Sequence, residues 1–172
     1  MIAKPILTDA PKYFHYYINI VIEEDLMNAF IELENITTTL INSIQEEQAN
    51  FRYAEGKWSV KEVLQHIIDS ERIFTYRALR FSRRDATPLS GFDENHYVPN
   101  ANTSERSIKN ILAEYQTVRA ASISLYKYMN NEMLDFKALA NGVENSARAM
   151  GWMIAGHNLH HLKVIKERYL NQ

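Results

Sequence analysis

The stretch Gly156-His157-Asn158-Leu159-His160-His161-Leu162 lies deep in the last predicted helix of the chain. His157 and His161 are four residues apart, so an α-helix places them about 40° apart around its axis and one turn apart along it. Their Cβ atoms would then lie roughly 5–6 Å apart, and both rings could reach one ion. Because two inward-facing imidazoles need buried partners, this spacing predicts a transition-metal site. Both histidines lie on the apolar stripe of the helix, which comprises Met150, Ile154, His157, His161, Val164 and Arg168.

Four long amphipathic segments account for most of the sequence. The second begins with Ser59-Val60-Lys61-Glu62, a capping box in which serine and glutamate bind free backbone N–H groups. Strand signals are weak, and Asn141-Gly142 is expected in the loop before the last helix rather than in a hairpin. Residues 1–172 are therefore predicted to form one all-α domain, a four-helix bundle. We expect helices over 24–44, from Ser59 to about Arg80, from Thr103 or Ser104 to about Met129, and from Asn145 or Ser146 to Tyr169.

One predicted connection is unusually long. About twenty residues, from Arg83 to Asn102, join the second and third helices. Loops of this length are uncommon in compact domains and are often functional when they are ordered. We expect this loop to fold over one end of the bundle and to shape the mouth of the metal site.

Composition limits the classes of function that the chain can have. A net charge of -2 and a pI near 6.3 provide no overall attraction to nucleic acid. The chain has no cysteine, which excludes disulfides, thiolate ligands and a protein thiol nucleophile, and fits a reducing compartment. The longest uncharged stretch, Tyr13 to Ile22, is half of the ~20 residues that a membrane span needs. We expect a soluble, cytoplasmic protein with neither a nucleic-acid nor a membrane partner.

Two histidines do not complete a metal site, since zinc and similar ions usually take three protein ligands and keep another position open for chemistry. His66 is the best candidate for the third ligand. It lies midway along the second predicted helix, where it can face the histidine pair of the last helix in a bundle. Three imidazoles suit a divalent transition metal. Zinc, nickel, iron and manganese are the expected ions, and copper is also compatible.

Several blocks of the sequence carry a family resemblance. KWSVKEVLQHIIDSER at 57–72, YRALRF at 76–81 and GFDE at 91–94 are followed by AGHNLHHL at 155–162 and ERY at 167–169. In residues, order and spacing, these blocks resemble the DinB/YfiT-like superfamily. The match extends over nearly the whole chain.

The resemblance implies an up-down-down-up four-helix bundle, usually dimeric, whose metal ligands are His66, His157 and His161. Members of the family include S-transferases that use bacillithiol or similar thiols, and mycothiol-dependent maleylpyruvate isomerases. It therefore favours a thiol-dependent S-transferase acting on a small molecule in a homodimer. Because the chain has no cysteine, such chemistry requires an exogenous low-molecular-weight thiol. The resemblance assigns no catalytic residue beyond the ligands.

Two other functions stay open. Water in place of the thiol would give a metal-dependent hydrolase, whereas a closed coordination sphere would give a non-catalytic, structural metal-binding bundle. The pair His157 and His161 also invites comparison with the His-Glu-x-x-His motif of metalloproteases. Asn158 stands where that motif has its general base, so metalloprotease chemistry by this route is not expected.

Other polar residues have simpler expected roles. His160 is expected to be a partly exposed neighbour of the site, His96 to face solvent, and His15 to pack among N-terminal aromatic residues. Asp69 and Glu71 could orient a ligand, but ion pairs on the helix surface are the simpler expectation. A cluster of four arginines could bind an anionic substrate, although a solvated helix end explains it more simply. The cluster comprises Arg77, Arg80, Arg83 and Arg84.

Overall fold

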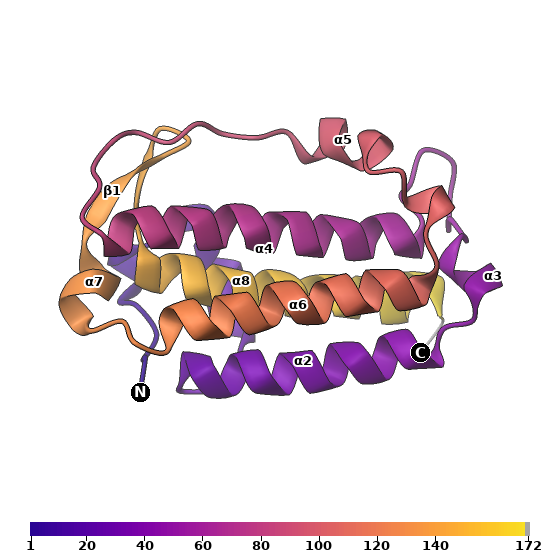
Figure 1. The fold of residues 1–172 in the computed structure, drawn as a ribbon, viewed down its shortest axis with the longest axis horizontal. Helices are drawn as coiled ribbons and strands as arrows, with labels where there is room; N and C mark the ends of the chain where they lie inside the picture. Colours follow the sequence, from indigo (N-terminus) through magenta and orange to yellow (C-terminus); the bar gives the residue numbers. More distant parts are fainter. Residues whose placement is uncertain (171–172) are drawn as a thin grey trace.

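The computed structural model describes residues 1–170 as a bundle of four long helices, as the sequence predicts (Figure 1). Helices α2 and α8 run in one direction while α4 and α6 run in the other, which is the expected up-down-down-up topology. Helix α4 packs against α6 and α8, and α2 completes the bundle against the same two helices. None of the described helices is both long and apolar enough to cross a membrane. The long helices are α2 (Leu26–Ser43), α4 (Val60–Ser82), α6 (Ile108–Tyr126) and α8 (Ala147–Val164), and α8 continues into a π-helical turn at Ile165–Tyr169.

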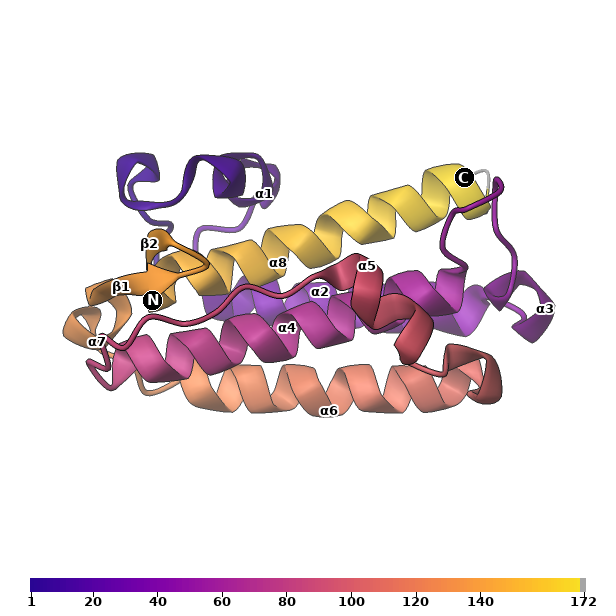
Figure 2. The same cartoon turned by 90° about the horizontal axis from the view of Figure 1, so that it is seen from above.

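Shorter elements decorate one side and the ends of the bundle. Figure 2 shows the N-terminal segment lying outside the bundle, with α1 beside α8. Turns of 3-10 helix occupy 7–9, 12–14, 98–100 and 103–105. The remaining elements are α1 (His15–Ile20), α3 (Glu46–Ala49), α5 (Glu94–Tyr97), α7 (Asn131–Asp135), β1 (Lys137–Ala140) and β2 (Val143–Ser146).

Serine caps mark the starts of three of the long helices, α4, α6 and α8. Ser59 accepts a hydrogen bond from the backbone N–H of Glu62 (3.3 Å) and Glu62 accepts one from Ser59 (2.6 Å), so the predicted capping box is confirmed. Ser146 caps α8 in the same way, by accepting from Ala149. The third long helix begins later than predicted, at Ile108, because Ser107 provides its cap. The residues around the predicted start form only a 3-10 turn.

The hairpin before α8 corrects the expectation of a plain loop. Strands β1 and β2 pair antiparallel, with Ala140 opposite Val143, and Asn141-Gly142 closes the turn. Both turn residues have positive φ (53° and 72°), which Asn and Gly adopt readily and which a tight hairpin requires. Strands of four residues are too short to show a period-two pattern, so Asn141-Gly142 was the feature of the sequence that could indicate the hairpin.

The long connection between α4 and α6 runs beside α4 instead of folding over one end, as Figures 1 and 2 both show. The topology explains this correction. Since α4 and α6 are parallel neighbours, the chain must return along the full length of α4, about 35 Å for its 23 residues. Leu89 fixes the crossover to the hairpin, because it donates to the Leu139 carbonyl and accepts from the Asn141 N–H, both at 2.9 Å.

A buried polar network joins the four long helices. The Arg119 guanidinium on α6 donates to both carboxylate oxygens of Glu71 on α4, at 2.9 and 2.8 Å, and neither side chain is more than 2% exposed. Arg119 also donates to the Phe30 carbonyl on α2 (3.2 Å) and to the Asn158 side chain on α8 (3.1 Å). Tyr115 donates to the same Asn158 oxygen at 2.8 Å. The expectation of a surface ion pair for Glu71 was therefore wrong.

Breaking this ion pair should destabilise the bundle strongly. Arg119→Met leaves the Glu71 carboxylate buried without its countercharge, and we expect the free energy of unfolding to fall by about 3–5 kcal/mol. The double variant Glu71→Leu/Arg119→Met should lose much less than that, because no buried charge remains. Urea unfolding measures both changes. Arg72→Met serves as the matched control: Arg72 pairs with Glu114 at the surface, and its removal should cost about 0–1 kcal/mol. Equal losses for Arg119→Met and Arg72→Met would contradict this account.

Candidate metal centre

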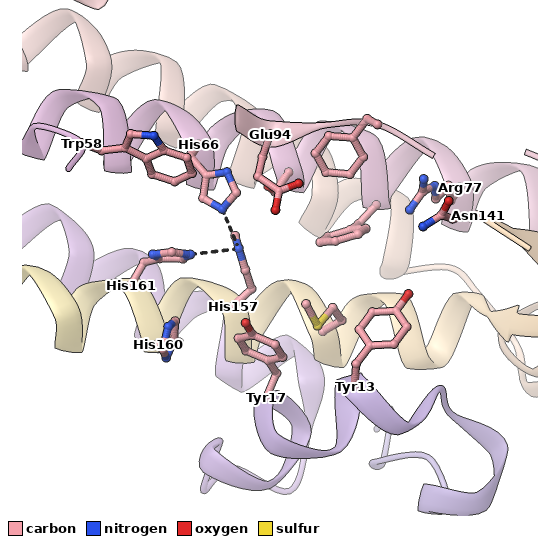
Figure 3. A pocket seen from close by; sticks show the side chains of 14 residues that line it. Tyr13, Tyr17, Trp58, His66, Arg77, Glu94, Asn141, His157, His160 and His161 are labelled. Carbon is pink, nitrogen blue, oxygen red and sulfur yellow. Dashed lines mark hydrogen bonds between the residues drawn. The ribbon is translucent and has the colours of Figure 1, made fainter. Parts of the chain in front are cut away.

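Three histidines from two helices meet inside the bundle, and they are the three that the sequence singled out. The Nε2 atom of His157 lies 3.0 Å from Nε2 of His66 and 3.1 Å from Nε2 of His161. One ring nitrogen from each of the three lies within 4.8 Å of the other two. His66 comes from α4, and the other two lie one turn apart on α8, as their spacing predicts. Figure 3 shows the three rings pointing toward one another.

Hydrogen bonding alone cannot satisfy this arrangement. A neutral imidazole nitrogen carries either one proton or one lone pair, so Nε2 of His157 makes a full hydrogen bond to only one of its two neighbours. Nδ1 of His161 is buried and has no hydrogen-bond partner within residues 1–170. Buried polar atoms that lack partners are costly. A single cation that accepts a lone pair from Nε2 of each ring would remove the conflict at Nε2 of His157.

Burial also keeps the three rings neutral. Desolvation lowers the pKa of His66 to about 4, although the nearby Glu94 carboxylate raises it. Desolvation, with His66 and His160 adding to it, lowers the pKa of His161 to about 3. The pKa of His157 is lowered well below its ordinary value, by desolvation first and then by the surrounding histidines. The three rings are therefore uncharged at neutral pH, which is the form that binds metals.

The spacing of the nitrogens matches ligands on one ion. With metal–nitrogen bonds of about 2.0–2.1 Å, two imidazole nitrogens lie roughly 2.9–3.4 Å apart for angles between a right angle and the tetrahedral angle. The distances of 3.0 and 3.1 Å fall within this range. The two distances from His157 therefore fit ligands on one ion, and three imidazoles suit a divalent transition metal.

A cavity of about 380 Å³ extends from the histidines between α4 and α8. Its walls include two segments outside the four long helices, namely the N-terminal segment, with Tyr13 and Tyr17, and the crossover, with Phe92 and Glu94. Figure 3 shows the Glu94 carboxylate beside His66 and facing the cavity. The crossover therefore does shape the cavity, although from the side of the bundle.

Gly156 lets the N-terminal segment close this cavity. A Cβ atom at this position would lie 2.0 Å from the Tyr17 carbonyl oxygen, so only glycine allows α1 to pack directly on α8. The contact places the Tyr17 ring 5.8 Å from the ring of the adjacent His157. Gly156, immediately before His157, was an unused signal in the sequence.

The other candidate residues mostly lie where the sequence placed them. His160 is partly exposed and approaches the Tyr16 hydroxyl (3.3 Å), and His96 is exposed. His15 is half-buried and contacts the Ala10 carbonyl instead of an aromatic cluster. Asp69 pairs with Arg72 at the surface as expected.

The arginine cluster divides into separate environments. Arg80 pairs with Asp85, and Arg84 pairs with Glu132 at the surface. Arg77, in contrast, is buried and lines the cavity. Burial under the crossover could not be foreseen from helix spacing alone.

The buried histidines should make the stability of the metal-free protein depend on pH. In the folded protein the pKa is about 4 for His66 and about 3 for His161, below the 6.5 of an ordinary histidine. The unfolded chain therefore takes up protons first as the pH falls. The free energy of unfolding should therefore fall between pH 6.5 and about 4, by about 1.4 kcal/mol per pH unit for each histidine that stays neutral. Urea unfolding at pH 7, 6 and 5 should show that the free energy of unfolding depends less steeply on pH in the double variant His66→Gln/His161→Gln than in the wild type. His15→Gln is the control, and an unchanged slope in the double variant would contradict the prediction.

Comparisons with known proteins agree with this fold. A family model described as the DinB superfamily matches residues 29–165. A protein of Oceanobacillus iheyensis named "Putative metal-dependent hydrolase" is 29% identical over 152 residues, which cover 83% of this chain and 84% of that protein. The structure of YfiT from Bacillus subtilis superposes with a TM-score of 0.71 at 16% identity, covering 98% of this chain and 92% of that one. YfiT is described as a probable metal-dependent hydrolase with an unusual four-helix bundle topology. Since the family model spans most of its length, this chain belongs to the DinB superfamily.

Proposed function

We propose that His66, His157 and His161 bind one divalent transition metal and that the protein is a metal-dependent hydrolase of small molecules. The convergence of three neutral ring nitrogens, which cannot satisfy one another by hydrogen bonds, carries the proposal. The descriptions of the Oceanobacillus iheyensis protein and of YfiT support the same reaction class. A divalent ion, when bound, lowers the pKa of a water ligand and polarises a substrate carbonyl.

Glu94 is our candidate for the general base. Its carboxylate faces the cavity beside His66, and it makes no ion pair within residues 1–170. It is close enough to raise the pKa of both His66 and Tyr17. A carboxylate in this position can take a proton from the attacking water and pass it to the leaving group. The base therefore comes from the crossover, whereas the metalloprotease motif places it on the ligand helix.

Elemental analysis tests the metal site first. Protein purified without chelator or a His-tag should carry about one transition metal per chain, and His66→Ala and His157→Ala should lose it because two imidazoles remain. His160→Ala is the matched control on the same helix and should keep the metal, since its ring lies outside the convergent set. No metal in the wild type, and none bound on titration with zinc, nickel, iron or manganese, would refute the proposal.

The variant Glu94→Gln tests the role of Glu94 as a base separately from metal binding by the histidines. Hydrolysis should be assayed on a panel of aryl esters and amides, and we expect kcat to fall about 10²–10⁴-fold, as for removal of a general base. Metal content should stay at the wild-type level. Asp93→Asn, which changes the neighbouring acid that caps α5, is the control. Equal activity in Glu94→Gln and the wild type would remove Glu94 from the mechanism.

Thiol S-transfer is the second candidate function. The cavity of about 380 Å³ has room for a small thiol together with an electrophile, and the chain has no cysteine to supply the sulfur. Turnover that requires an added low-molecular-weight thiol would favour transfer over hydrolysis. A metal-loaded protein that is inactive in both assays would instead be a structural metal-binding bundle. A cytoplasmic homodimer without a nucleic-acid partner remains a prediction from the sequence and its family resemblance.

A further inference from the structure

The cavity has a second polar end, remote from the histidines. Arg77 lies eleven residues after His66 on α4, which is about 20° around the helix and about 16 Å along it. Both side chains line the cavity, and Figure 3 shows them at opposite ends of it. The ring of Phe74 lies 6.2 Å from that of His157 and also packs against the Arg77 guanidinium. Phe92 packs against Phe74 at 6.4 Å, so aromatic rings line the middle of the cavity.

Arg77 is a buried cation without a carboxylate partner in the described part of the chain. Its side chain packs against the rings of Phe74 and Phe92, at 5.8 and 5.7 Å from the ring centroids. It donates one hydrogen bond, to the Ser90 carbonyl at 2.9 Å. A guanidinium has five N–H donors, so most of its donor capacity remains for a ligand. Burial lowers the pKa of Arg77, although the nearby Tyr13 raises it.

Two other buried cations within residues 1–170 do have acidic partners. Lys61 is 3% exposed and pairs with Glu46, and Arg119 is fully buried and pairs with Glu71. Arg77, which is 5% exposed, is the exception. Because a buried cation without countercharge is costly, this arrangement indicates that an external anion completes the site.

Neutral donors stand at the same end of the cavity. Asn141 lines it next to Arg77 (Figure 3), and its backbone N–H is held by the Leu89 carbonyl. Its side chain lies over Gly91, where a Cβ atom would come within 2.3 Å of the amide oxygen. Tyr13 lines the cavity from the N-terminal segment. A guanidinium supplemented by a carboxamide and a phenol provides donors for one planar, singly charged group.

We propose that Arg77, Asn141 and Tyr13 form a carboxylate-binding subsite, and that the substrates are elongated carboxylic acids whose reacting group reaches the histidines across the apolar middle. The claim that the reacting group lies at the histidines rests on the proposed function, whereas binding of the carboxylate to the subsite needs no metal. A single guanidinium among neutral donors matches a carboxylate better than a doubly charged phosphate.

The first test uses metal-free protein and two probes of equal length, octanoate and octanamide, in isothermal titration calorimetry. Octanoate should bind at least about tenfold more tightly than octanamide to the wild type, because its charge makes hydrogen bonds to the guanidinium. The ratio should fall to near one in Arg77→Met and stay above one in Arg77→Lys. The melting temperature of Arg77→Met should not decrease, since the change removes an unpaired buried cation. If Arg77→Met does not fold, Arg77→Gln replaces it.

Equal binding of octanoate and octanamide to the wild type would overturn the subsite. So would an octanoate preference that survives in the neutral variant at position 77. Tighter binding of octylphosphonate than of octanoate would overturn the assignment to carboxylates. The control Arg80→Met removes an arginine one turn along α4 that pairs with Asp85, and it should leave the preference unchanged.

A second measurement tests the span between the two ends and separates the two proposals. In zinc-loaded protein, suberic acid monohydroxamate should bind more tightly than octanohydroxamate, because one end chelates the ion while the other reaches Arg77. Arg77→Met should abolish that difference. If the protein takes up no metal but still prefers octanoate to octanamide, only the proposed function is refuted. A bound metal with no preference for the ω-carboxylate would refute the subsite alone.

Discussion

The buried ion pair between Glu71 and Arg119 is the constraint on which the site depends. Its two parallel hydrogen bonds fix α4 against α6, and the further contact from Arg119 to Asn158 fixes α8 relative to both. Asn158 directly follows His157, and Glu71 lies little more than one turn after His66. The same network that satisfies the core therefore sets the axial register at which the histidines of α4 and α8 meet.

The convergence of the three histidines could be predicted because it depends on local spacing. An i, i+4 pair on a helix fixes two ring positions before any tertiary structure is known, and a bundle leaves few helices for the third. The capping box at Ser59 and the serine cap at Ser146 are local in the same sense, and both are confirmed. The resemblance to the DinB/YfiT-like superfamily added the topology, which spacing alone does not determine.

The remaining features depend on which helices are neighbours and in which direction they run. Glu71 meets a partner 48 positions away only because α4 and α6 pack side by side, so its burial carried no local signal. The same parallel arrangement forces the crossover along α4, and this covers Arg77 and brings Glu94 to the histidines. The short hairpin was missed for a different reason, since four-residue strands show no period and only Asn141-Gly142 marked the turn.

The cavity is lined partly by the core helices and partly by segments outside the bundle. His66 and His157 belong to core helices whose register is tied to a buried network, so substitutions around them threaten the fold itself. Tyr13, Phe92 and Asn141 belong to segments laid over the outside of the bundle, where loops tolerate change. Changes in the outer segments can therefore alter the lining of the cavity while the helices that bring the three histidines together stay in register.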